Sequence, residues 1–226
     1  MRQVRQIMGM PISIDIPDCR DGSVFAAAFE RLRQIDARFS TYKPDSEVSR
    51  FAAGKIPEAG LSDELKSAIK ACREAEAETD GYFSAWAAGV FDPSGYVKGW
   101  AVAEAGKVIE TKNYRTYCVG AGGDILARSD SDFEWKIGVQ DPQDRSKILD
   151  VLSIFNGAVC TSGSYERGAH IINPKTRQPA DELVSVTVSG PDIILADVLA
   201  TALFAMGRQK AATFMKSQPD YRAMII

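Results

Sequence analysis

The chain has one histidine, His170, and four cysteines among its 226 residues. None of the cysteines forms a Cys-x-x-Cys pair, so the sequence lacks the ligand spacing of a structural zinc site. The 27 Lys and Arg residues do not outnumber the 30 Asp and Glu residues, and the net charge is -3. A general nucleic-acid-binding protein would normally show a basic excess, so this class is disfavoured.

Long apolar runs are absent as well, and no stretch reaches the length needed to span a membrane. The N-terminus has two early arginines but no continuous apolar segment and no small-residue cleavage site. It alternates instead, with Ile12, Ile14 and Ile16 on one face, which predicts a strand. We therefore expect a cytoplasmic protein without membrane insertion, whose thiols are reduced.

The sequence that remains is ordinary for a globular protein, with 45% hydrophobic and 25% charged residues. Apolar spacing predicts a helix over residues 23–39, and Ser62 is a cap for a second. A turn that begins at Asp92 leads into a third helix, and the stretch 191–207 predicts a fourth. The polar stretch between residues 39 and 55 contains Pro44 and Gly54 and is predicted to be mostly loop.

Strands are predicted in hairpins as well as beside helices. YRTYCVG and DILARS are two strands joined across glycines, FEWKIGVQ is a third, and Asn156-Gly157 indicates a two-residue hairpin turn. LVSVTVSG and the final YRAMII are two more. This order predicts an α+β fold with a largely antiparallel sheet and packed helices, not a βαβ nucleotide-binding fold. No linker divides the chain, so residues 1–226 are taken as a single domain.

The helix over 191–207 carries Asp197 and Thr201, which are four residues apart and therefore share one face. The rest of this helix is apolar nearly all round, so it is expected to be buried. An ionised carboxylate there is costly unless it is paired or binds a metal. Two alternatives follow: a buried Asp that caps a neighbouring loop, or an all-oxygen site for a hard cation such as Mg²⁺.

Two turns could receive an anion. The glycines at 120, 122 and 123 allow close backbone approach to a ligand, although a tight hairpin turn would explain them equally. They form neither a dinucleotide-binding fingerprint nor a P-loop. Lys98 lies where a turn becomes a helix and would suit a phosphate, although a solvated surface lysine is the commoner case.

The segment TSGSYERGAHIINP gathers hydroxyls, an acid, a base and His170 within a few residues. It lacks the G-x-S-x-G frame, which disfavours a Ser-His-Asp hydrolase. His170 is either a packing residue or a catalytic acid–base group.

Taken in order, several motifs resemble the FAD:protein FMN transferases, the ApbE-like flavin transferases. They are MGMPISI, FSTYKPDSEVSRF, DPSGYVKGWAV, AGGDI, TSGSYERGAHIINPKTRQP and SVTVSGPDIILADVLATALFAMG, and they cover most of the chain. Four positions depart from the family pattern: Met10 stands in place of Thr, Ala103 in place of an acid, Asn173 in place of Asp, and Arg177 in place of Gly.

The resemblance implies a two-lobed α+β domain with FAD in its cleft. Family members use Mg²⁺ to cleave the FAD pyrophosphate, attach FMN to a Thr or Ser hydroxyl of an acceptor protein and release AMP. It implies metal ligands at Asp197, at Thr201 and at the Val97 carbonyl, and a role in transfer for His170. The implied FAD-binding residues are Met8, Tyr42, Lys98, Gly122, Gly123, Asp124 and Thr161.

Two other functions remain open at this point. Water could replace the acceptor, which would make the protein an FAD pyrophosphatase that yields FMN and AMP. A protein that binds FAD without turnover belongs to a different class. AMP release and flavin labelling of an acceptor distinguish the three.

Overall fold

The computed structural model describes residues 1–164 and 171–226. A seven-stranded sheet has the order β1-β2-β3-β4-β7-β10-β11, and each neighbouring pair is antiparallel. Its strands are β1 (Arg2–Ile7), β2 (Met10–Asp15), β3 (Tyr117–Ala121), β4 (Asp124–Arg128), β7 (Gly157–Gly163), β10 (Ser185–Gly190) and β11 (Arg222–Ile225). The predicted antiparallel α+β fold is confirmed; the two lobes and the single-domain boundary stay predictions.

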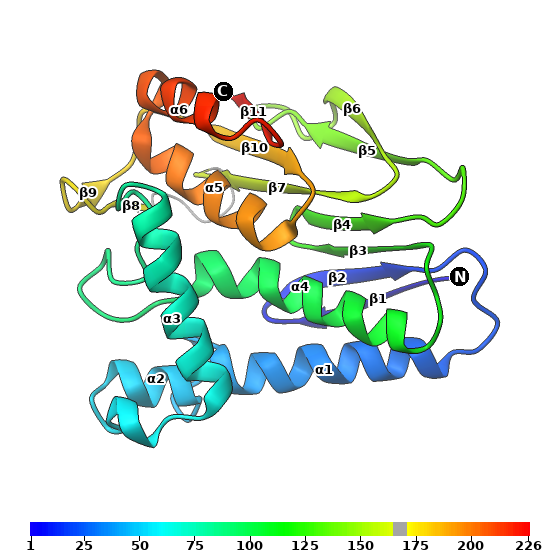
Figure 1. Cartoon of the computed structure of the whole chain (residues 1–226), viewed down its shortest axis with the longest axis horizontal. Helices are drawn as coiled ribbons and strands as arrows, with labels where there is room; N and C mark the ends of the chain where they lie inside the picture. The colour runs from blue at the N-terminus through cyan, green and yellow to red at the C-terminus, as the bar shows by residue number, and fades with distance from the viewer. Residues whose placement is uncertain (165–170) are drawn as a thin grey trace.

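Helices cover one face of this sheet, as Figure 1 shows for α1, α4 and α5. The helices are α1 (Ser23–Phe39), α2 (Glu47–Ala52), α3 (Asp63–Glu78), α4 (Ser94–Thr111), α5 (Ile193–Met206) and α6 (Arg208–Phe214). Two 3₁₀ turns, Glu58–Gly60 and Met215–Ser217, complete them. The four helices predicted from apolar spacing and caps are thus confirmed.

The stretch predicted to be mostly loop is mostly irregular, and it also contains α2, which was not predicted. The Ser46 side chain accepts a hydrogen bond from the Ser49 amide, and Glu47 lies in the first turn. Both are standard signals of a helix N-terminus. Pro44 and Gly54, which favour a loop, lie just outside the helix on either side.

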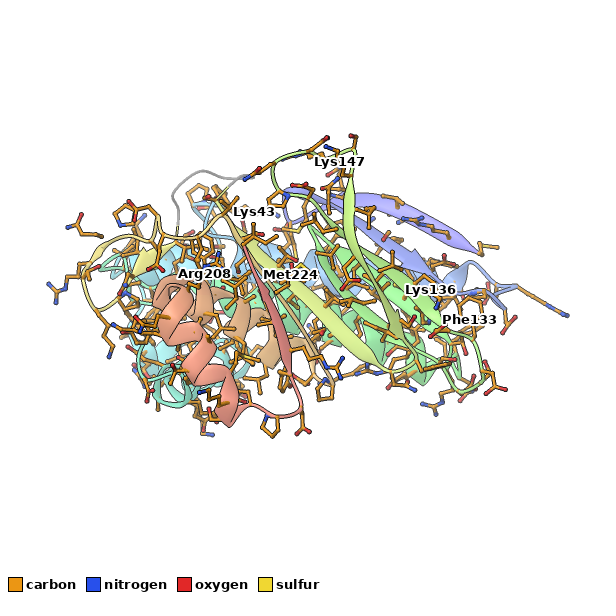
Figure 2. The ribbon with its side chains drawn as sticks, turned by 90° about the horizontal axis from the view of Figure 1, so that it is seen from above. Lys43, Phe133, Lys136, Lys147, Arg208 and Met224 are labelled. Atoms are coloured by element: carbon orange, nitrogen blue, oxygen red, sulfur yellow. The ribbon has the colours of Figure 1, made fainter. Side chains whose placement is uncertain are left out.

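A two-stranded ribbon, β5 (Trp135–Gln140) and β6 (Ile148–Ile154), packs on the other face of the sheet. Its Trp135 and Ile137 contact Ala127 and Val159, whose neighbours in β4 and β7 point to the helices. Side chains alternate between the faces of a strand, so the ribbon and the helices lie on opposite sides. Figure 2 shows Lys136 near one end of the ribbon and Lys147 near the other.

The hairpin predicted at Asn156-Gly157 is wrong. β6 pairs with β5, whereas β7 pairs with β4 and β10, so these two residues connect different sheets. A type I′ turn needs positive φ at both central residues. Neither residue has it. Asn156 instead binds Ser129, accepting from its amide at 3.1 Å and donating to its carbonyl at 2.9 Å.

Helices α4 and α5 pack unusually closely. A Cβ atom added at Gly99 of α4 would lie 2.9 Å from the Ile193 carbonyl oxygen and 3.0 Å from the Asp197 Cβ. Only glycine allows this approach, which brings the Gly99 amide within 2.8 Å of Asp197 Oδ2. Asp192 caps the start of α5, and Gly207, with φ 77°, ends it. These features fix the position of Asp197 relative to α4.

An ionic cluster joins α1, α3 and α4. The Arg31 guanidinium contacts Glu64 and Glu104, each at 2.7 Å. Burial would raise the pKa of Glu104, but hydrogen bonds from Lys107 and Arg31 outweigh it and lower that pKa. The cluster therefore stabilises the helical layer while Glu104 is ionised.

All four cysteines are free thiols, as expected. Among the described residues, no helix is both long enough and apolar enough to cross a membrane.

Candidate functional site

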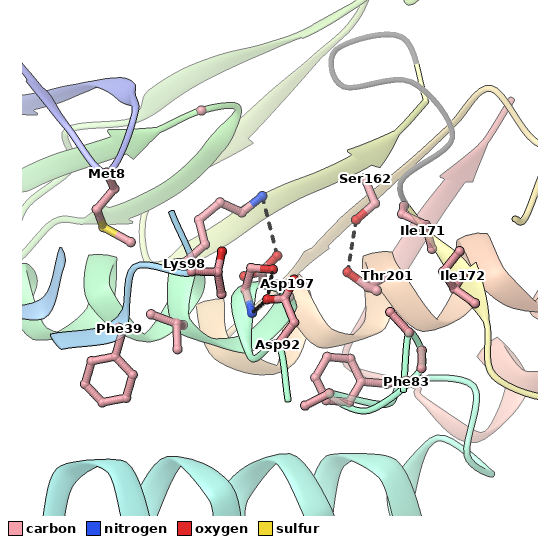
Figure 3. A pocket seen from close by; sticks show the side chains of 18 of the residues that line it. Met8, Phe39, Phe83, Asp92, Lys98, Ser162, Ile171, Ile172, Asp197 and Thr201 are labelled. Carbon is pink, nitrogen blue, oxygen red and sulfur yellow. Dashed lines mark hydrogen bonds and ion pairs between the residues drawn. The ribbon is translucent and has the colours of Figure 1, made fainter. Parts of the chain in front are cut away.

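A pocket opens between the helical layer and the turns at one end of the sheet (Figure 3). Met8 and Phe39 lie at one end of it, and Phe83, Ile171 and Ile172 lie at the other. Of the sequence-predicted residues, the pocket is lined by Met8, Tyr42, Val97, Lys98, Gly122, Gly123, Thr161, Asp197 and Thr201. The fold thus brings together nine predicted residues from six distant segments.

Lys98 lies beside Asp197 in the middle of the pocket (Figure 3). Its Nζ is 3.0 Å from Asp124 Oδ2 and 3.6 Å from Asp197 Oδ1. Burial lowers the pKa of Lys98, but the charges of the two carboxylates outweigh it and raise that pKa. The lysine is therefore a fixed positive charge in the pocket, and the alternative of a solvated surface residue is wrong.

Asp197 is 1% exposed, as the apolar helix predicted. Burial raises its pKa, and Lys98 and the Gly99 amide oppose that rise. Oδ2 accepts the Gly99 hydrogen bond, whereas Oδ1 has Lys98 at 3.6 Å, which is too long for a strong hydrogen bond. One carboxylate oxygen is thus fixed and the other is available.

Thr201 lies one turn further along α5 and also lines the pocket. Its Oγ1 is 3.2 Å from the Ser162 hydroxyl oxygen (Figure 3). If the proton of Thr201 points to Ser162, a lone pair of Thr201 is free for a cation. Sequence reasoning did not select Ser162, whose partner is 39 residues away.

Asp124 has a different place from the other predicted FAD-binding residues. Its exposure is 0%, and it does not contribute to the pocket wall. Oδ1 accepts a hydrogen bond from the Thr161 amide at 3.2 Å, and Oδ2 pairs with Lys98. Burial raises its pKa, and the Lys98 charge opposes that rise. Asp124 therefore contacts the pocket through two other residues.

The glycine turn between β3 and β4 is both a tight turn and part of the pocket, so the two alternatives are compatible. Gly122 and Gly123 have φ of 53° and 93°. A Cβ at Gly122 would lie 2.7 Å from the Met10 sulfur, whereas one at Gly123 would meet nothing within 4 Å. Gly122 thus permits packing against the β1–β2 hairpin, and Gly123 leaves open space.

The remaining predicted residues lie at the rim or outside the described part. Met8, with φ 57°, belongs to the β1–β2 turn. Tyr42 is 86% exposed and contributes one edge of the pocket, where a ligand would cover it. His170 lies outside the described residues. Asp92, just before α4, lines the pocket and was missed, although an acid before a helix start is a visible signal.

The donor set in the pocket suits a hard cation. Asp197 and Thr201 offer oxygen ligands, and Mg²⁺ commonly completes such a shell with water and phosphate oxygens. Within residues 1–164 and 171–226, no three His, Cys, Asp or Glu side chains converge as a ready-made metal site. A cation here would thus complete its shell with water or with oxygen atoms of a ligand.

The model of the ApbE family matches residues 8–91 and 85–225. The chain belongs to the ApbE family. An FAD:protein FMN transferase of Klebsiella pneumoniae (strain 342) is 32% identical over 133 residues, which are 54% of this chain and 38% of the relative. The chain thus aligns with well under half of that relative's length.

Solved structures of the ApbE family share the fold. The flavin transferase ApbE from Vibrio cholerae has a TM-score of 0.86 at 21% identity, over 100% of this chain and 93% of that one. The ApbE protein from Thermotoga maritima has a TM-score of 0.85 at 24% identity, over 100% and 94%. At these identities the likeness concerns the fold alone.

Proposed function

We propose that the protein is a Mg²⁺-dependent FAD:protein FMN transferase. The observation that carries this is the pocket of Figure 3: a lysine and a carboxylate at the centre, with apolar side chains at both ends. FAD has matching parts, two ring systems joined by a diphosphate. The Klebsiella pneumoniae relative has the name FAD:protein FMN transferase, which supports FAD as the substrate.

In this proposal, Asp197, Thr201 and the Val97 carbonyl hold the cation, which neutralises diphosphate charge when bound. The Lys98 ammonium stabilises charge on the phosphoryl oxygens, and its fixed position makes it ready to do so. Met8, Tyr42, Gly122, Gly123 and Thr161 form the surrounding wall.

The transfer step joins the hydroxyl oxygen of an acceptor Thr or Ser to the phosphorus on the FMN side. The bond from that phosphorus to the bridging oxygen breaks, and AMP leaves with the oxygen. His170 takes the hydroxyl proton as general base. In this proposal the acceptor is a protein, and the activity involves neither nucleic acid nor insertion into a membrane. A cytoplasmic location is also part of the proposal.

The test incubates the purified protein with FAD, with and without Mg²⁺ and a flavoprotein acceptor. AMP is measured by chromatography and flavin on the acceptor by in-gel fluorescence and mass. Mg²⁺-dependent labelling with AMP release supports the transferase. AMP without labelling indicates the pyrophosphatase, and bound FAD with neither product indicates a binding protein.

Two variants assign the roles. Asp197→Asn keeps an acceptor for the Gly99 amide but removes the charge, and we expect it to abolish Mg²⁺-dependent AMP release. His170→Asn should retain FAD and lower transfer by about 10²–10⁴-fold, the usual share of one acid–base group. Normal turnover by either variant contradicts its assigned role.

A further inference from the structure

Asp124 and Asp197 both form an ion pair with the Lys98 ammonium, and the two carboxylates differ in their other surroundings. Asp197 faces the pocket. Asp124 is completely buried behind it, and Lys98 is its one ion-pair partner within the described residues. An ionised carboxylate that is removed from water requires a partner, so the 3.0 Å pair accounts for Asp124 being tolerated there.

The charges of Lys98, Asp124 and Asp197 sum to −1 when the lysine is protonated and both acids are ionised. Lys98 is closer to Asp124 than to Asp197, at 3.0 Å against 3.6 Å. Without Asp124, the ammonium would have Asp197 as its only acidic partner among residues 1–164 and 171–226, and the sum of the charges would be zero. A divalent cation would then compete with the lysine for the one available oxygen of Asp197.

We propose that Asp124 is a positioning residue for the cation site, holding the Lys98 ammonium so that Asp197 keeps its negative charge for a divalent cation. This rests on the proposed function, since it takes Asp197 as the metal ligand. Asp124 also fixes the pocket wall, because it accepts the amide hydrogen bond of Thr161, whose hydroxyl is 2.9 Å from that of Thr187. Its own side chain does not touch the ligand.

The test uses Asp124→Asn, which keeps an oxygen for the Thr161 amide and removes the charge. Mn²⁺ binding is measured by the electron paramagnetic resonance signal of the free ion, and FAD binding is measured separately in EDTA by flavin fluorescence quenching. We expect Mn²⁺ to bind at least ~10-fold more weakly, the usual effect of losing an outer-shell partner. Metal-free FAD, an anion, should bind as tightly as to wild type or more tightly.

A structural role would weaken the binding of both ligands, whereas a positioning role weakens Mn²⁺ binding and does not weaken the binding of metal-free FAD. Weakening of both ligands, or unchanged Mn²⁺ binding, overturns the proposal. Asp144→Asn is the matched control, because it removes an acid from another 3.0 Å lysine pair, with Lys147, outside the pocket. It should leave both affinities within about twofold of wild type.

Two further variants complete the design. Lys98→Met should have the opposite effect on the two affinities: metal-free FAD should bind more weakly, and Mn²⁺ should bind at least as tightly as to wild type. If Asp124→Asn does not fold, the Lys98→Met affinities test the proposal in its place. Weaker Mn²⁺ binding by Lys98→Met overturns the proposal. Asp197→Asn tests the cation site itself. If it binds Mn²⁺ like wild type, the proposed metal site is wrong, whereas a failure confined to Asp124→Asn refutes only the positioning role.

Discussion

The close contact between α4 and α5 makes Gly99→Ala the most informative single substitution. The new Cβ would lie 2.9 Å from the Ile193 carbonyl oxygen and 3.2 Å from Asp197 Oδ2. The carbonyl belongs to the backbone of α5, so it cannot move without shifting the helix. The substitution should therefore separate the two helices and weaken the Gly99–Asp197 hydrogen bond.

The magnitude follows from three effects. Overpacking of this kind typically costs about 1–3 kcal/mol. Loss of a hydrogen bond to a charged acceptor costs about 1.5–3 kcal/mol, and alanine recovers about 1 kcal/mol through helix propensity. We expect a net destabilisation of roughly 1.5–5 kcal/mol, which lowers the Tm of a chain of this size by at least about 3 °C.

Thermal unfolding by circular dichroism measures the stability, and AMP release from FAD with Mg²⁺ measures the site. The reorientation of Asp197 should reduce AMP release by at least about tenfold. Gly60→Ala is the control, because Gly60 is exposed and its Cβ would meet nothing closer than 3.4 Å. A Gly99→Ala protein with wild-type Tm and AMP release would refute the close-packing argument.

Three other substitutions test separate contacts. Asn173→Asp loses the 2.9 Å donation to the Ala205 carbonyl and sets a charge against it; Tm should fall by an amount equivalent to about 1–3 kcal/mol, and an unchanged Tm argues against this anchor. Ser162→Ala removes the partner of Thr201, so Mn²⁺ binding should weaken by about tenfold or more while Tm changes little; equal affinity removes Ser162 from the site. The folded-state pKa of Glu104 is lowered, so its ionised form stabilises the fold above the unfolded value of about 4.3, and this contribution is lost as pH falls through the folded pKa. Glu104→Gln should thus lower Tm at pH 7, and its difference from wild type should shrink as pH falls below about 4.3 and through the lowered folded pKa. A Tm difference that does not change with pH contradicts this.

Features that depend on residues within one or two turns of each other could be predicted from the sequence. The ends of α5 follow from Asp192 and Gly207, and the spacing of Asp197 and Thr201 places both on one face. The strands likewise follow from alternation. Local signals also mark one short helix that was not predicted: Ser46 and Glu47 begin α2, between Pro44 and Gly54.

Features that depend on partners far along the chain were decided by the tertiary structure. No local rule shows that Lys98 pairs with Asp124 and Asp197, because these residues meet only when α4, β4 and α5 pack together. Asn156-Gly157 has the composition of a hairpin turn, yet β6 pairs with β5 and β7 pairs with β4. The two residues therefore connect strands of different sheets and do not form a hairpin turn. Patterns in the sequence predicted which side chains could act on a ligand, whereas the charge and the fixed positions of those side chains come from burial and long-range contacts.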